Sequence, residues 1–204
     1  MKLKVIFIDW DGTLSGSRFW EHWLDEDPDS YNKIQQDLFI GNGGMVQDWM
    51  RGYIAAEQVV SEVAQRTGLD YQYLLHGLEE SCKSMVLTHP NILDLIKAKR
   101  DQGLKVVVAT DNMDTFHRWT VPAMKLEHHF DGILTSVEAG ALKEDMAADG
   151  SSLFFHDYFN QNAIEPGQSL LIDDRDMGQI TSKLGMNFAQ VTPSFNVHDA
   201  FRSL

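Results

Sequence analysis

Short runs of apolar residues, each bounded by acids, polar residues or glycine, recur along the 204-residue chain. They are rich in β-branched residues, which is typical of buried strands. The predicted strands are Leu3–Asp9, Leu104–Thr110, Ile133–Ser136, Ser169–Asp173 and Asn187–Val191. Because the runs are almost continuously apolar, we expect both faces of each strand to be covered, as in a parallel sheet.

Helical patterns lie between these strands. Pro90 stands where a first helical position is expected, and Gly103 supplies a stop; a later helix ends at Gly185. The apolar stripes of the two helices are Ile92, Leu93 and Ile96 in the first and Met177, Ile180 and Leu184 in the second. Alternating strands and helices predict an α/β fold with a Rossmann-like open parallel sheet.

The interval between the first two predicted strands is too long for this alternation of strands and helices. Asp9 and Thr110 lie about 100 residues apart, whereas a strand–helix–strand unit needs only about 30. The surplus, residues 15–87, contains Trp20, Trp23 and Trp49 and few strand-like runs. We therefore predict a small α-helical cap domain, 15–87, inserted after the first strand of a discontinuous core, 1–14 and 88–204.

Composition and charge restrict the partners. With 17 Lys and Arg against 30 Asp and Glu, the net charge of −13 argues against nucleic acid and against an anionic membrane surface. The single cysteine, Cys82, cannot form an internal disulfide, which favours a reducing compartment. Asp9 and Asp11 cut the first apolar run short, so no signal peptide is expected. These observations predict a soluble cytoplasmic protein.

Polar residues that could carry chemistry follow the predicted strands. They are Asp9 and Asp11, Thr110, Asp173 and Asp174, with Lys143 in a loop after the third strand. Each has a structural alternative: a turn for Asp9–Gly12, a helix cap for Asp173–Asp174, and a solvated charge for the lysine. Taken together, however, they converge on the carboxyl edge of one sheet, where ligands of open α/β sheets bind. Crowded carboxylates there need a compensating cation, and Mg²⁺ prefers oxygen ligands.

These residues also resemble four ordered family motifs. The segments DWDGT at Asp9–Thr13, VVVAT ending at Thr110, Lys143, and LLIDD ending at Asp174 are similar to the motifs of the haloacid dehalogenase superfamily. A helical insertion between the first two motifs resembles the superfamily's type 1 cap. The last motif, DDRDMG, resembles the form found in the beta-phosphoglucomutase-like group, with Arg175 in place of serine.

The resemblance implies a role for each matching residue. Asp9 would be the nucleophile that forms an aspartyl-phosphate, and Asp11 the acid and then the base. Thr110, Asp111 and Lys143 would hold phosphoryl oxygens. Mg²⁺ would lie on the Asp9 carboxylate, the Asp11 carbonyl and Asp174, with Asp173 acting through a water. An acid at position 11 favours phosphoryl transfer, because the dehalogenases of the superfamily lack one there.

The residues after Lys143 depart from the family pattern, and two arginines of the insertion lie outside it. Lys143 is followed by Glu144 and Asp145, where proline is usual, and these acids compete for the lysine. Arg18 and Arg51, in the insertion, fit a second anionic group of a substrate, but solvated surface charges are the favoured interpretation.

The predicted function is a Mg²⁺-dependent phosphatase of small phosphorylated metabolites. A phosphomutase or phosphotransferase uses the same core and passes the phosphoryl group to another hydroxyl, so the motifs do not separate it from a phosphatase. A degenerate, non-catalytic phosphate-binding module is the alternative from another class.

Overall fold

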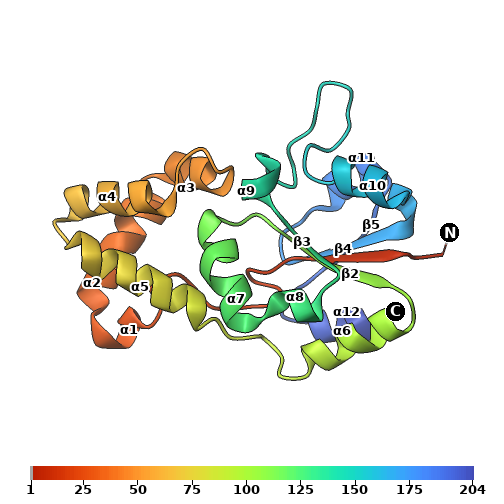
Figure 1. Ribbon diagram of the computed structural model, residues 1–204, viewed down its shortest axis with the longest axis horizontal. Helices are drawn as coiled ribbons and strands as arrows, with labels where there is room; N and C mark the ends of the chain where they lie inside the picture. Colours follow the sequence, from red (N-terminus) through yellow and green to blue (C-terminus); the bar gives the residue numbers. More distant parts are fainter. Residues whose placement is uncertain (1) are drawn as a thin grey trace.

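Five strands form one parallel β-sheet in the structure, a computed structural model that describes residues 2–204 (Figure 1). Their order in space is β3-β2-β1-β4-β5, so β1 is central. All five predicted strands are confirmed, with ends shifted by at most two residues. The bounds are β1 Val5–Ile8, β2 Lys105–Thr110, β3 Gly132–Thr135, β4 Ser169–Asp173 and β5 Asn187–Gln190.

Helices cover both faces of the sheet. Successive strand side chains point to opposite faces, so each central strand contributes to two apolar clusters. Ile6 and Ile8 of β1 pack into one apolar cluster, whereas Val5 and Phe7 pack into another. The first cluster includes residues of α6 (Ile92–Asp101), π-helix η2 (Phe116–Thr120), α7 (Val121–Met124), α8 (Leu126–His129) and α12 (Val197–Arg202). The second includes residues of α10 (His156–Asn162) and α11 (Gly178–Leu184). This confirms the predicted α/β fold with a Rossmann-like open sheet.

Two glycines end the predicted helices as expected. Gly103 follows α6 with a φ of +85°, and Gly185 caps α11 with a φ of +75°. Side chains other than glycine rarely adopt this left-handed conformation. Short helices complete the core: α9 (Ser136–Ala139) follows β3, and the 3-10 helix η3 (Pro166–Gln168) precedes β4. None of the helices within residues 2–204 is long and apolar enough to cross a membrane.

The chain between β1 and β2 forms a helical unit with its own core. Its elements are α1 (Trp23–Glu26), α2 (Pro28–Ile34), π-helix η1 (Gln35–Ile40), α3 (Gly43–Met50), α4 (Ala56–Thr67) and α5 (Tyr71–Lys83). Trp20, Trp23 and Trp49 lie in this core with Val60 and Leu74. The helical character predicted for this interval is thus found, and Figure 1 places the unit beside the sheet.

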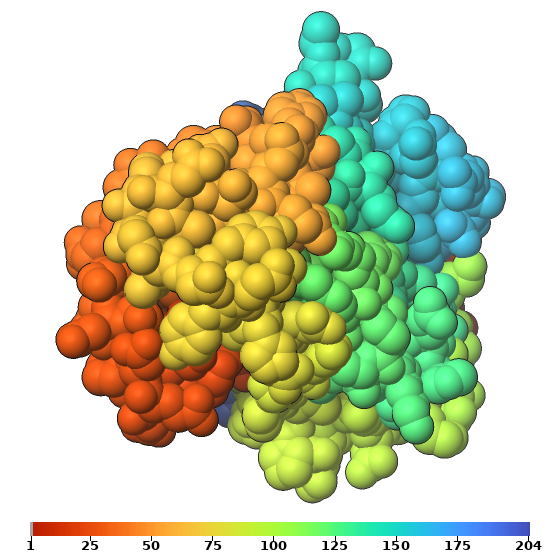
Figure 2. All heavy atoms as spheres, turned by 60° about the vertical axis from the view of Figure 1, so that its left-hand side comes forward, coloured from red at the N-terminus to blue at the C-terminus, as the bar shows by residue number. Residues whose placement is uncertain are grey.

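The two segments that join the helical unit to the sheet run side by side. Ser15 and Leu87 form an isolated antiparallel bridge, and the Thr88 N–H donates to the Leu14 carbonyl at 2.9 Å. The Ser15 hydroxyl also donates to the Val86 carbonyl. Entry and exit are therefore held together next to the carboxyl end of β1. The helical unit consequently packs against the core, as its orange and yellow atoms do against green ones in Figure 2.

A glycine-to-alanine change tests the packing of this unit. Alanine normally stabilises an exposed helix relative to glycine, but a Cβ at Gly77 of α5 would overlap the indole of Trp23. That indole is stacked on Tyr73, with ring centroids 4.3 Å apart, so it cannot turn aside freely. We expect Gly77→Ala to lower the free energy of unfolding by about 1–3 kcal/mol.

Urea unfolding provides the measurement, and Gly44→Ala provides the control. Gly44 lies in α3 with nothing within 4 Å of an added Cβ, so its substitution should cause no loss of stability. A Gly77→Ala protein as stable as the Gly44→Ala protein would contradict the packing.

Candidate active site

Three carboxylates meet at the carboxyl edge of the sheet. Asp9 directly follows β1, Asp173 ends β4 and Asp174 comes next. The parallel register places Ile8 beside Ile172, so the residues that follow are neighbours as well. One oxygen from each carboxylate lies within 4.8 Å of the others. These acids, predicted from separate strands, could together hold a metal ion, and an all-oxygen set of ligands suits a hard divalent cation.

Lys143 is the counter-charge for this cluster. Its side chain is fully buried, with Nζ 2.8 Å from Oδ1 of Asp9 and donating to Oδ2 of Asp173. Burial alone would lower the pKa of Lys143, but attraction by Asp9, Asp173 and Asp111 outweighs it and raises the pKa. The ammonium is therefore charged, at the centre of the predicted site.

The acidic residues after Lys143 do not draw it away. Asp145 instead forms a two-pronged ion pair with Arg51 of the helical unit, at 3.0 Å from both Nε and Nη2. Its Oδ2 also accepts the Leu142 N–H at 2.9 Å. The ion pair thus fastens the helical unit to the turn that carries Lys143. The favoured interpretation of Arg51 as a solvated charge is wrong, because its side chain is only 19% exposed and ion-paired.

The loop after β1 brings in a second titratable carboxyl. Asp11 lines the cavity and accepts a hydrogen bond from the side-chain amide of Asn112 at 2.9 Å. Desolvation, with the nearby charge of Asp9, raises the pKa of Asp11 to about 7. Desolvation also raises the pKa of Asp9, to about 6, with Lys143 opposing it. A carboxyl with a pKa near neutrality can both give and take a proton.

Gly12 is required by this loop for two reasons. Its φ is +76°, and an added Cβ would overlap the carboxylate of Asp174. Asp174 therefore lies against the bare main chain of the DWDGT segment. Burial, together with the charge of Asp173, raises the pKa of Asp174. Such repulsion among acids is the situation that a bound cation relieves.

Thr110 and Asp111 follow at the end of β2. Thr110 is fully buried, and its hydroxyl has no hydrogen-bond partner among residues 2–204. Buried hydroxyls are usually hydrogen-bonded, so this group has unused capacity to donate. The Asp111 carboxylate is engaged within the protein: it accepts the Lys143 main-chain N–H at 2.9 Å and pairs with Arg175. The Asp111 carboxylate therefore already has partners within the protein, and the phosphate contact of this residue stays a prediction.

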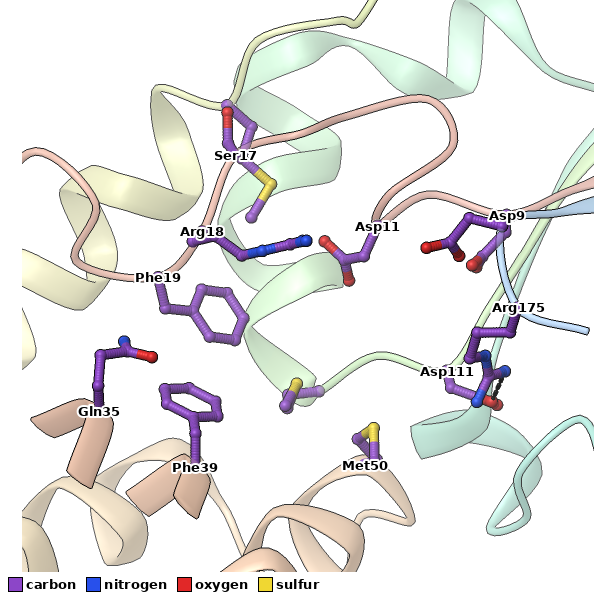
Figure 3. Close-up of a pocket in the computed structure, with 13 residues that line it drawn as sticks. Asp9, Asp11, Ser17, Arg18, Phe19, Gln35, Phe39, Met50, Asp111 and Arg175 are labelled. Atoms are coloured by element: carbon purple, nitrogen blue, oxygen red, sulfur yellow. Dashed lines mark hydrogen bonds and ion pairs between the residues drawn. The ribbon is translucent and has the colours of Figure 1, made fainter. Parts of the chain in front are cut away.

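Three residues near the cavity were not among the predicted site residues. Asn112 is buried and orients Asp11. Arg175, noted only as a departure from serine, pairs with Asp111 and has Nε 3.7 Å from Asp173. Arg18, interpreted as a solvated charge, lines the cavity and extends toward Asp11 (Figure 3). Their types were visible in the sequence, but only the folded chain brings them to the acids.

A cavity of about 430 Å³ opens between the sheet edge and the helical unit. Four of the predicted acids lie at one end of it, and side chains of the helical unit and neighbouring loops form the other (Figure 3). Its lining includes Asp9, Asp11, Asp111, Asp174, Arg18 and Arg175 at the polar end. The structure thus gathers at one place the acids, the lysine and the threonine predicted from four separate motifs.

The family is established by comparison with known proteins. The model of the haloacid dehalogenase-like hydrolase family matches residues 6–157. The chain therefore belongs to this family of hydrolases, and the resemblance inferred from its motifs is confirmed. No curated protein matches the chain in sequence.

Solved structures share the whole fold at low identity. The HAD family enzyme BT-2542 from Bacteroides thetaiotaomicron, as its magnesium complex, has a TM-score of 0.74 at 16% identity, covering 99% of this chain and 100% of that chain. The complex of the same enzyme with magnesium and inorganic phosphate has a TM-score of 0.66 at 15% identity, covering 93% of this chain and 94% of that chain. L-2-haloacid dehalogenase from Xanthobacter autotrophicus, with chloropropionic acid covalently bound, has a TM-score of 0.63 at 13% identity, covering 93% of this chain and 77% of that chain. At these identities the likeness is one of fold.

Removing the buried ammonium tests the charge balance. Lys143→Met would leave Asp9 and Asp173 facing each other without their cation, so we expect the free energy of unfolding to fall by about 3–5 kcal/mol. Lys97→Met is the matched control, because Lys97 makes an exposed ion pair with Asp101 that contributes about 1 kcal/mol at most. Urea unfolding in EDTA measures both. Equal stability of the two variants would show that the acids do not depend on Lys143.

Proposed function

We propose that this hydrolase is a Mg²⁺-dependent phosphatase of small phosphorylated metabolites, with Asp9 as nucleophile. The observation that carries the proposal is a second carboxyl, Asp11, which lines the cavity together with Asp9 and is held by the Asn112 amide at 2.9 Å. Burial also raises the pKa of Asp11, to about 7. Release of an alcohol from a phosphate ester needs a proton donor, whereas release of a halide does not. A group able to donate at neutral pH therefore supports phosphoryl transfer over dehalogenation.

Magnesium fits the oxygen ligands at the sheet edge. Asp9 and Asp174 would hold it through carboxylates and Asp11 through its carbonyl, while Asp173, engaged by Lys143, would act through a water. When bound, the ion supplies charge neutralisation to the acids and the phosphoryl oxygens. The BT-2542 complex with magnesium and inorganic phosphate supports this assignment through its shared fold.

The chain's own residues account for nucleophilic attack. Asp9 attacks phosphorus, forming an aspartyl-phosphate while the bond from phosphorus to the ester oxygen breaks. Lys143, 2.8 Å from Asp9, offsets negative charge that accumulates on the phosphoryl oxygens. Thr110 has a buried hydroxyl free to donate to one of those oxygens. Both groups are fixed before the substrate arrives, so little reorganisation is needed during the reaction.

Asp11 carries the proton. In the first step it protonates the departing ester oxygen, and in the second it accepts a proton from the water that attacks the phosphoryl group. Asn112 donates to Oδ2 of Asp11 and so fixes which face of the carboxyl is turned to the substrate. The second step regenerates Asp9 and releases inorganic phosphate.

We also propose that residues 15–87 act as the cap of the site. The paired segments at Ser15 and Leu87 form the connection, and the Arg51–Asp145 ion pair joins the cap to the core on the Lys143 side. The Trp49 indole N–H donates to Asp114 at 2.7 Å and adds a second link. Such a cover would keep bulk solvent away from the phosphoryl group while it is transferred to Asp9.

Turnover of 4-nitrophenyl phosphate with Mg²⁺ tests the proposed chemistry. We expect turnover to vanish in Asp9→Asn and in EDTA, because the nucleophile or the cation is then missing. Asp11→Asn should lower kcat by about 10²–10⁴-fold with alkyl phosphates, whose leaving groups need a proton. The control is Asp29→Asn, an exposed acid of α2 outside the cavity, which should retain normal turnover.

Two results would overturn this proposal. Release of chloride from 2-chloropropionate, without hydrolysis of any phosphate ester, would identify a dehalogenase. Undiminished turnover in Asp9→Asn would place the nucleophile elsewhere. Transfer of the phosphoryl group to an added sugar faster than to water would instead identify the phosphotransferase alternative.

A further inference from the structure

The cavity has two ends of different chemistry. Its floor carries the acids, whereas the wall toward the helical unit is apolar (Figure 3). The apolar residues that line the cavity are Phe19, Phe39, Met50, Met85 and Met113. The rings of Phe19 and Phe39 lie with centroids 6.5 Å apart. The organic part of a substrate whose phosphoryl group lies at Asp9 would therefore meet aromatic rings and thioethers.

A π-helix presents part of this wall. Gln35 and Phe39, four residues apart on η1 (Gln35–Ile40), both line the cavity. The next residue, Ile40, is 70% exposed, so it points away. Single π-helical turns are rare in proteins as a whole, but those that occur are frequently at functional sites, because the wider turn changes the direction of side chains. Here it supplies one aromatic ring and one amide to the site.

Polar groups near the apolar wall are few. They are the amide of Gln35 and the hydroxyl of Ser17, which already accepts the Val86 N–H at 3.0 Å. The Arg18 guanidinium extends toward Asp11 and so belongs to the polar end (Figure 3). A sugar carries several hydroxyls, and each one buried against this wall without a partner weakens binding.

We propose that the site selects phosphate monoesters whose organic part is compact and largely apolar, such as an aryl or arylmethyl group, over sugar phosphates. This inference rests on the proposed phosphatase function. Burial of apolar surface against the wall favours binding of such a group, and the three flexible methionines can adapt to rings of different shape. Gln35 leaves room for one polar substituent on such a group.

The test compares two esters of primary alcohols, benzyl phosphate and glucose 6-phosphate, so that the leaving groups are alike and only the organic parts differ. With Mg²⁺ present, kcat/KM for benzyl phosphate should exceed that for glucose 6-phosphate by about 30-fold, the gain expected from burying one ring. Calorimetric binding of benzylphosphonate and methylphosphonate to the Mg²⁺-loaded enzyme gives a second readout without turnover. Benzylphosphonate should bind at least about tenfold tighter.

A pair of variants on one helical turn locates the effect. Phe39→Asn should reduce the preference for benzyl phosphate about tenfold, since it removes a ring from the wall and adds an amide. Ile40→Asn, at the exposed neighbouring position, should leave the preference unchanged. Similar loss in both variants would indicate general damage to the helical unit and overturn the role assigned to Phe39.

The outcomes separate the two proposals. Equal or faster hydrolysis of glucose 6-phosphate would overturn the apolar specificity and leave the phosphatase function standing. Hydrolysis of neither ester would count against the phosphatase function. In that case, tighter binding of benzylphosphonate would still support the apolar site, whereas equal binding of the two phosphonates would overturn it.

Discussion

The buried ammonium of Lys143 is the charge on which the candidate site depends. It lies between Asp9 and Asp173, whose side chains are only 6% and 0% exposed. Buried charges of one sign are tolerated only when an opposite charge and hydrogen bonds compensate them. The fold provides this compensation by placing the Lys143 turn against β1, β4 and Asp111, whose carboxylate accepts the lysine's main-chain N–H.

The same arrangement would allow an acidic protein to attract the phosphoryl group of the proposed substrate. A net charge of −13 repels anions at long range. Arg18 and Arg175 line the polar end of the cavity, and buried Lys143 pairs with Asp9 behind it, so positive charge lies close to the acids. A divalent cation would shift the balance further. The polar end thus depends on local charge, whereas the opposite wall contributes apolar surface. In the proposed function, the polar end of the cavity would hold the phosphoryl group and the apolar wall would select the organic group.

The sequence predicted the sheet well because buried strands leave a strong local signal. β4 was predicted at its observed bounds, Ser169–Asp173, and the glycine stops at Gly103 and Gly185 were correct. The motif residues were also found together, since parallel strands present their carboxyl ends at one edge. The sequence predicted less well where contacts are long-range. Arg51 finds Asp145 across 94 positions, and no local pattern indicates such a partner.

The surroundings of Lys143 illustrate the same limit. Sequence alone suggested that Glu144 and Asp145 compete for the lysine, but Asp145 is turned to the helical unit and to the Leu142 N–H. Asn112 was passed over because a buried amide in a loop has no periodicity to mark it. Residues that support a site through tertiary contacts are thus recognised only when the fold is known.

The proposed mechanism depends on Asp9 as the residue that carries the phosphoryl group. It is tested most directly by rapid acid quench of the Asp11→Asn enzyme with 4-nitrophenyl phosphate and Mg²⁺, followed by borohydride reduction and peptide mass mapping. This variant lacks the base for the second step, and the leaving group needs no proton, so the acyl phosphate should accumulate. Reduction then converts the phosphorylated aspartate to homoserine. We expect homoserine at position 9; homoserine at another acid, or phosphate release with residue 9 unmodified, would show that Asp9 is not the nucleophile.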